Sequence, residues 1–228
     1  MAIIIFDLFG TLVNKKKSHY DEALEWLANT YFENKYAELK KLSQIFKKKY
    51  LEERKVSNKE NSFFNQLTLF ENELNMKILD DFTAVELGFI YIFRKEKLVN
   101  GVTELLEYLN ENNYRVFILS NSIFSGASLK VYLNSLGIGK YIEEVFTSAD
   151  IGFRKPSKAV FTHVIEALEI SDPQKIYFIG DSVEKDYNGA KIAGFTPVLI
   201  GTNNNVPDQA FNNIPNLLRY LKSANNGA

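Results

Sequence analysis

The chain has 228 residues, enough for one large domain or two small ones. Hydrophobic residues make up 46% and charged residues 24%, the balance of a globular protein and not of a disordered one. With 27 Lys plus Arg against 28 Asp plus Glu, the formal net charge is -1, so no global field favours nucleic acid or anionic lipid. The absence of cysteine excludes disulfides, thiolate metal sites and a cysteine nucleophile. We therefore expect a small molecule as the partner.

The first predicted element is a buried strand over residues 3–6. These apolar, mostly β-branched residues suit a strand covered on both faces, as in a parallel sheet. The apolar run has no basic stretch before it and ends at Asp7, so it is too short for a secretion signal or a membrane span. We expect a cytoplasmic protein.

Similar apolar runs return later in the chain, at residues 115–120 (RVFILS), 144–148 (EVFTS), 175–180 (KIYFIG) and 196–201 (TPVLIG). Amphipathic stretches of helix length alternate with them, at residues 102–112, 128–136, 158–168, 184–193 and 214–221. Strands that alternate with helices imply right-handed crossovers. The pattern predicts an α/β fold with a doubly wound, parallel, five-stranded Rossmann-like core and helices on both faces.

Residues 15–97 break this alternation, because they contain no good strand and read as several consecutive helices. Their apolar positions recur at helical spacing, as in Leu24, Leu27 and Tyr31. We predict an all-helical domain over residues 15–97, inserted into a core that is made of residues 1–14 and 98–228.

Polar side chains follow three of the predicted strands: Asp7 the first, Ser120 and Asn121 the second, and Asp181 and Asp186 the fourth. Lys155 lies between the second and fourth strands, just before a predicted helix. In an open parallel sheet, ligands bind beyond the carboxyl ends of the strands, so we expect these side chains to converge. Asp7 and Asp181 would repel each other unless a cation lay between them. Magnesium suits two carboxylates because it is a hard ion that prefers oxygen ligands. Lys155 and Ser120 would then hold a phosphoryl group, and Asp7 would serve as a covalent nucleophile.

Four motifs in a fixed order resemble those of the haloacid dehalogenase superfamily: FDLFGTL at residues 6–12, ILSN at 118–121, RKP at 154–156 and GDSVEKDYNGAKIAGF at 180–195. The resemblance covers residues 3–7 and 99–201. It implies a hydrolase with a helical cap domain, the insert of residues 15–97, which closes over the site and selects the substrate.

The resemblance also implies a role for each motif residue. Asp7 would be the nucleophile, with Ser120 and Lys155 as further catalytic residues. Magnesium would be held by Asp7, the backbone carbonyl of Phe9 and Asp181, with Asp186 supporting its water shell. The phosphate ligands would be Thr11, Ser120, Asn121 and Lys155. We expect a magnesium-dependent phosphatase that acts on a small phosphorylated metabolite through an aspartyl-phosphate intermediate, as a monomer or homodimer without nucleic-acid or membrane partners.

Phe9 departs from the family pattern, because phosphatases of the family have a second aspartate at this position. That aspartate protonates the leaving alcohol and activates water, and such a general acid and base contributes on the order of 10²- to 10⁴-fold in rate. Phe9 cannot move a proton. A phosphatase without that acid should prefer good leaving groups, such as aryl or acyl phosphates.

Three alternatives follow from Phe9. Dehalogenases of the family also lack the second aspartate, but they need no metal and lack the GDS that stands here at residues 180–182. They carry an arginine near the first motif, whereas Arg54 and Arg94, the arginines before residue 100, are not in the expected setting. Phosphonate hydrolases of the family use a cap lysine. The third alternative is a weakly active protein that binds a phosphorylated ligand.

Overall fold

The computed structural model describes residues 2–15, 18–201 and 209–226. A parallel sheet has the strand order β3-β2-β1-β4-β5-β6. Its strands are β1 (Ile3–Phe6), β2 (Arg115–Ser120), β3 (Glu144–Thr147), β4 (Tyr177–Gly180), β5 (Thr196–Ile200) and β6 (Ala210–Phe211). The predicted fold class is confirmed, but the predicted number of five strands is wrong. The sixth strand has only two residues, too few to produce a recognisable apolar run.

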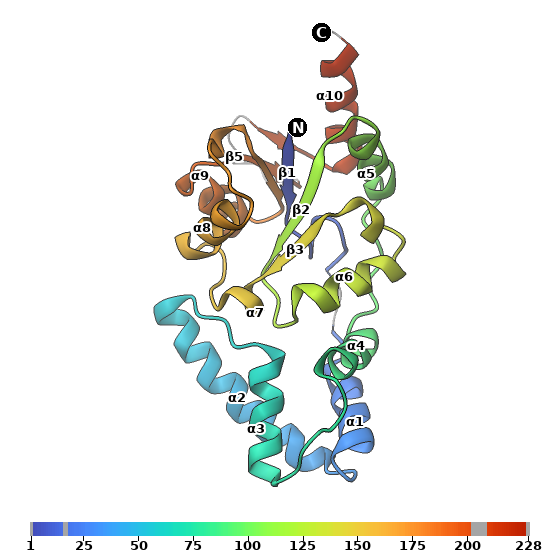
Figure 1. Cartoon of the computed structure of the whole chain (residues 1–228), viewed down its shortest axis with the longest axis vertical. Helices are drawn as coiled ribbons and strands as arrows, with labels where there is room; N and C mark the ends of the chain where they lie inside the picture. Colours follow the sequence, from blue (N-terminus) through green and yellow to red (C-terminus); the bar gives the residue numbers. More distant parts are fainter. Residues whose placement is uncertain (1, 16–17, 202–208, 227–228) are drawn as a thin grey trace.

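Alternation along each strand divides the core between the two faces of the sheet. Ile4 and Phe6 of β1 face one apolar cluster, and Ile5 between them faces the other. Helices α5 (Val102–Glu111), α6 (Gly126–Ser135) and α10 (Ile214–Asn226) cover the first face, and α8 (Lys158–Ala167) and α9 (Gly189–Ile192) cover the second (Figure 1). The short elements are α7 (Ser148–Ile151), two 3-10 turns at Gly139–Tyr141 and Pro173–Lys175, and the π-helical turn η3 (Val183–Asn188).

Four helices, here called the helical segment, lie between β1 and α5: α1 (Tyr20–Tyr31), α2 (Tyr36–Ser57), α3 (Phe63–Leu74) and α4 (Phe82–Phe93). They lie beyond the end of the sheet at which β1 and β2 finish (Figure 1). The chain passes to and from this segment along adjacent paths, because Asn14 N–H donates to the carbonyl of Lys97 at 2.9 Å and Val99 N–H donates to that of Leu12 at 2.9 Å. Among the described residues, no helix is both long and apolar enough to cross a membrane.

The sheet register fixes the position of the predicted site. Strand β1 pairs with β2 and β4, with Phe6 opposite Ile118 on one side and Ile179 on the other. Asp7 extends this pairing, since its N–H donates to the carbonyl of Ile179 at 2.8 Å. The residues that follow β1, β2 and β4 are therefore brought to one edge of the sheet, facing the helical segment.

Candidate active site

Asp7 is a buried carboxylate, 7% exposed, at the centre of this edge. Lys155 Nζ donates to its Oδ1 at 2.8 Å, and Thr11 Oγ1 donates to its Oδ2 at 3.2 Å. Burial raises the pKa of Asp7 from 3.8 to about 6; Lys155 opposes that rise, and Asp186 and Asp181 add repulsion to it. Asp7 thus lies in surroundings where a further positive charge would favour its ionised form.

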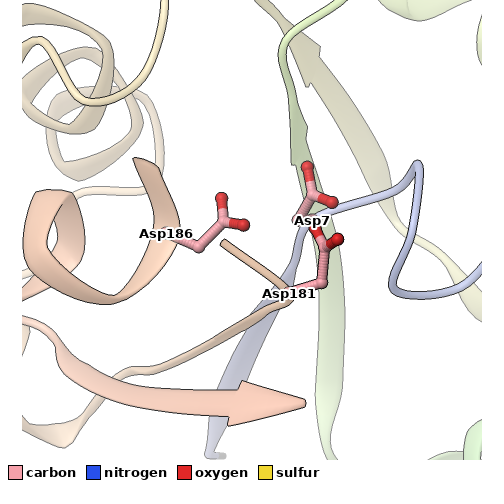
Figure 2. A group of neighbouring side chains, drawn as sticks. All are labelled: Asp7, Asp181 and Asp186. Carbon is pink, nitrogen blue, oxygen red and sulfur yellow. The ribbon is translucent and has the colours of Figure 1, made fainter. Parts of the chain in front are cut away.

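Two more carboxylates converge on Asp7, those of Asp181 and Asp186 (Figure 2). One oxygen from each of these residues lies within 4.8 Å of the other two. The carbonyl of Phe9 accepts no backbone hydrogen bond from the described residues, so it is also free to act as a ligand. This set of oxygen donors fits a hard divalent cation, because mutual repulsion among the carboxylates would be relieved by one ion between them.

Two glycines make this convergence possible. Gly10 has a φ of 107°, a conformation in which a side chain is strained, and a β-carbon there would lie 2.5 Å from Oδ2 of Asp181. At Gly180, a β-carbon would collide with the side chain of Asp186. The glycines of the first and last motifs therefore leave room for the carboxylates.

Asp186 lies on η3, where the predicted α-helix over residues 184–193 begins instead with a π turn. Its Oδ2 accepts a hydrogen bond from the N–H of Ser182 at 2.9 Å, and its Oδ1 lies 2.7 Å from Lys155 Nζ. Single π turns occur frequently at functional sites. Here the π turn carries an aspartate whose carboxylate points back toward the strand ends.

Lys155 is 2% exposed and bridges Asp7 and Asp186, and its Nζ also donates to the carbonyl of Leu119 at 2.8 Å. Burial alone would lower the pKa of Lys155, but the carboxylates of Asp186 and Asp7 outweigh it and raise the pKa above its ordinary value. Asn121 holds the lysine in place, because its amide donates to the backbone carbonyl of Lys155 at 2.9 Å and accepts from its N–H at 2.8 Å.

A cavity of about 160 Å³ opens onto these groups; its lining residues are Asp7, Phe9, Lys15, Ser120, Asn121, Arg154, Lys155, Asp181, Ser182, Lys185 and Asp186. Ser120 lines it with a buried Oγ that has no hydrogen-bond partner among the described residues. Thr11 is fully buried and contacts Asp7 without lining the cavity. Of the four predicted phosphate ligands, three therefore face this cavity, and Ser120 has its hydroxyl free to donate.

Phe9 also lines the cavity, and Arg94 lies against its ring with the guanidinium carbon 3.9 Å from the ring centroid. Arg94 follows α4 directly, and its Nη1 pairs with Glu96 at 2.8 Å. The position of this arginine near Phe9 could not be predicted from the sequence, because the two lie 85 residues apart. The structure places it at the edge of the site.

Sequence reasoning missed three further cations that line the cavity: Lys15, Arg154 and Lys185. The Lys15 ammonium forms an ion pair with Asp181, although its side chain is 61% exposed. Arg154 stands beside Lys155 in the RKP motif, so its position was the signal that could have revealed it. Its partner is Glu60, in the connection between α2 and α3, and nothing in the sequence links the two.

Curated relatives of the chain include the HAD-hydrolase YfnB of Bacillus subtilis (strain 168), 30% identical over 100 residues, or 43% of this chain and 40% of YfnB. Another is the glyceraldehyde 3-phosphate phosphatase of Methanothermobacter thermautotrophicus, 29% identical over 104 residues, or 45% of this chain and 44% of that protein. A third is the pyrimidine 5'-nucleotidase YjjG of Escherichia coli (strain K12), 28% identical over 41% of this chain and 40% of YjjG. These matches span less than half the length of the relatives.

Solved structures share the fold over nearly the whole chain. A crystal structure of YfnB bound to magnesium matches with a TM-score of 0.59 and 19% identity, covering 97% of this chain and 98% of that one. The 2-haloacid dehalogenase of Pseudomonas syringae matches with a TM-score of 0.65 and 16% identity, covering 98% and 99%. The family model of the haloacid dehalogenase-like hydrolases, which describes their common sequence pattern, matches residues 1–194 of this chain. The chain therefore belongs to the haloacid dehalogenase-like hydrolase family.

Proposed function

We propose that the protein is a magnesium-dependent phosphatase that acts on a small phosphorylated metabolite, with Asp7 as the nucleophile. The observation that carries the proposal is the group of three carboxylates, Asp7, Asp181 and Asp186, whose oxygens lie within 4.8 Å of one another around the nucleophile. Such a group suits a divalent cation, and magnesium is the usual partner of carboxylates and phosphate. Displacement of halide from carbon has no use for one.

The relatives support the same choice. Several of them are phosphatases and nucleotidases, among them the enzymes of M. thermautotrophicus and E. coli. YfnB has been crystallised with magnesium. Glyceraldehyde 3-phosphate and pyrimidine 5'-nucleotides are small phosphorylated compounds, and we propose the same class of substrate here.

In the proposed reaction, an oxygen of Asp7 attacks phosphorus while the bond from phosphorus to the ester oxygen breaks, and the leaving oxygen keeps the electron pair. Water then attacks the phosphorus of the aspartyl phosphate and releases Asp7 and inorganic phosphate. Lys155 and the free hydroxyl of Ser120 would hold the phosphoryl oxygens. Magnesium, held by Asp7, the carbonyl of Phe9 and Asp181 with Asp186 behind its waters, would supply charge neutralisation at those oxygens.

Phe9 decides which leaving groups react fast. Phe9 lines the cavity at the position where a phosphatase of the family would have its general acid, and its side chain has no proton to give. Esters whose oxygen leaves readily as an anion, such as aryl and acyl phosphates, should therefore be the best substrates.

We further propose that the helical segment acts as the cap, within a division of the chain into residues 1–14 and 98–228 for the core and 15–97 for the cap. The two chain connections between the core and the cap, near Asn14 and Lys97, are hydrogen bonded to each other, which suits a hinge. A lid at this position would exclude water from the aspartyl phosphate.

The test is to measure phosphate release from 4-nitrophenyl phosphate, with magnesium and with excess EDTA, beside halide release from 2-chloropropionate. We expect metal-dependent phosphate release, no halide release, and loss of activity in Asp7→Asn. The acid-quenched enzyme should carry the mass of one phosphoryl group on the peptide that contains Asp7. Halide release that survives EDTA would favour dehalogenation, for which Arg94 beside Phe9 would offer a cation.

A further inference from the structure

Arg154 and Lys155 are neighbours in the chain and line the same cavity, but their side chains have different partners. The Lys155 ammonium contacts Asp7 inside the site. The Arg154 guanidinium turns to the helical segment, where its Nη1 donates to a carboxylate oxygen of Glu60 and to the hydroxyl of Tyr50, the latter at 3.0 Å. Arg154 also lines the site cavity. It therefore forms the wall on the side of the helical segment, where the leaving part of a substrate bound at Asp7 would lie.

The helical segment holds Arg154 firmly. The N–H of Arg154 donates to the carbonyl of Asn58 at 2.9 Å, and the N–H of Glu60 donates to that of Gly152 at 2.9 Å, so two short strands of chain pair across the boundary. The Glu60 side chain is fully buried and also accepts a hydrogen bond from Ser148 Oγ at 2.5 Å. A guanidinium fixed in this way loses little conformational entropy when it binds a ligand.

Part of this guanidinium has no protein partner. Within the described ranges, every side-chain hydrogen bond of Arg154 comes from Nη1, so Nε and Nη2 have no acceptor there. Of the other cations of the cavity, Lys155 is neutralised by Asp7 and Asp186, and Lys15 by Asp181, whereas Lys185 has no ion-pair partner within the described ranges. Arg154 therefore presents directed donors to the cavity, and a guanidinium fork fits carboxylate and phosphate oxygens.

The charges around Glu60 do not balance. Arg54 Nη2 lies 3.4 Å from Oε1 of Glu60, so two guanidiniums share this single carboxylate. Among the described residues, neither arginine has another acidic partner within ion-pair distance. Arg54 also has a buried Nε without a hydrogen-bond partner. An uncompensated positive charge in a partly buried cluster is unfavourable, and an anion in the cavity would offset it.

The cluster around Glu60 also borders a second cavity. This cavity, of about 410 Å³, lies between α1, α2 and α3, and Tyr50, the hydrogen-bond partner of Arg154, forms part of its wall. Lys40 and Lys47 also line it. Lys47 has no ion-pair partner in the part of the chain that the structure describes. Because Asp21, which also lines this cavity, pairs with Lys40, Lys47 leaves its wall with one positive charge in excess.

We propose that Arg154 is a specificity-determining residue that binds an anionic group on the leaving part of the substrate, so that the preferred substrates carry a carboxylate or a second phosphate besides the scissile one. This inference rests on the proposed phosphatase function, because it concerns the substrate of the same site. The shared chemistry is an anionic group of oxygens at a distance from the reacting phosphorus.

The test uses three aryl phosphates on one scaffold: phenyl phosphate, 4-carboxyphenyl phosphate and 1,4-phenylene bisphosphate. With magnesium, the wild-type kcat/KM should be about 10- to 100-fold higher for at least one anionic compound than for phenyl phosphate, the size expected of a charge-assisted hydrogen bond. The compound that gains shows whether the anion is a carboxylate or a phosphate. In Arg154→Gln, the ratio of kcat/KM between the anionic compound and phenyl phosphate should fall toward one, mainly because KM for the anionic compound rises. The matched control is Arg54→Gln, which removes an arginine that shares Glu60 without lining the site cavity, and the ratio should stay within about 3-fold of wild type.

Each other result has one meaning. Turnover of phenyl phosphate without any preference for the anionic compounds overturns the inference and leaves the proposed function standing. Equal loss of the ratio in Arg154→Gln and Arg54→Gln also overturns it, because the effect would then come from the charge of the cluster. If the wild type hydrolyses none of the three, the phosphatase function itself fails. If Arg154→Gln does not fold by circular dichroism, Arg154→Lys, which keeps the charge but loses the fork, takes its place, and an unchanged ratio there refutes the proposal.

Discussion

Replacing Phe9 by Asp supplies the group that the proposed mechanism lacks. The side chain at position 9 lines the site cavity, so a carboxyl group there would lie near the leaving oxygen of a substrate bound at Asp7. A positioned general acid contributes about 10²- to 10⁴-fold in rate. We expect Phe9→Asp to speed the hydrolysis of an alkyl phosphate, whose alkoxide leaves poorly without a proton. Aryl phosphates should gain much less.

The structure places the expected gain at the lower end of that range. The guanidinium of Arg94 lies 3.9 Å from the centroid of the Phe9 ring, so it would lie beside the new carboxylate. A positive charge within 4–6 Å lowers the pKa of a carboxyl group by about 1–3 units, which leaves less of the protonated acid near neutral pH. We therefore expect about a 10²-fold gain. Adding Arg94→Gln should add about 10-fold, the effect of about one pKa unit.

The assay is kcat for an alkyl phosphate such as ethyl phosphate, in saturating magnesium, with Phe9→Asn as the matched control. Asn has the size of Asp but cannot donate a proton as an acid. The loss of the contact between Arg94 and the ring costs about 0.5–2 kcal/mol, so melting curves must show that both variants are folded. If folded Phe9→Asp is no faster than Phe9→Asn, the missing-acid explanation is refuted.

Three other perturbations probe charges in and near the site. The pKa of Asp7 is raised from 3.8 to about 6 in the folded protein. The folding stability that this raised pKa contributes is therefore fully present below pH 3.8 and is lost as the pH rises through about 6. Without metal at pH 7.5, the free energy of unfolding of Asp7→Asn should therefore exceed that of wild type by up to about 3 kcal/mol, which corresponds to roughly two pKa units, and its melting temperature should be higher. At pH 4 the two proteins should differ little. Equal melting curves at pH 7.5 would contradict this prediction. Lys15→Met removes an exposed ion pair with Asp181, a predicted metal ligand, and should tighten magnesium binding up to about 5-fold. Calorimetry would measure this affinity, and unchanged or weaker binding would count against Asp181 as a ligand. Glu60→Gln leaves two guanidiniums without their carboxylate, so the free energy of unfolding measured in urea should fall by about 3 kcal/mol. A second change, Arg154→Met, should recover part of that loss. A loss under about 1 kcal/mol would show that the ion pairs of Glu60 contribute little to stability.

Much of the site follows from local pattern. The apolar β-branched run of residues 3–6 suits a buried strand, which the structure confirms, and Asp7 directly after it is therefore expected at the carboxyl edge of a parallel sheet. The same reasoning applies to Ser120 after β2 and Asp181 after β4. Their convergence was predictable because adjacent parallel strands end at the same edge.

Other features were not predictable, because they depend on which side chain fills a given space. The motif position of Asn121 indicated a phosphate ligand, but its amide bonds to the backbone of Lys155 on both sides, which a string of letters cannot show. The residues of η3 do not distinguish its π turn from the first turn of an ordinary α-helix. The two-residue strand β6 forms only because β5 offers it an edge to pair with.

The sequence by itself determined the alternating architecture, the place of the helical segment and the set of carboxylates, since these follow from periodicity and from residues next to strand ends. Only the tertiary structure brought Arg154 to Glu60 and Arg94 to Phe9, pairs that lie 94 and 85 residues apart. The physical reason is that hydrogen bonds and charge contacts act over a few ångströms, and distances of that order between remote residues are set by packing of the whole chain.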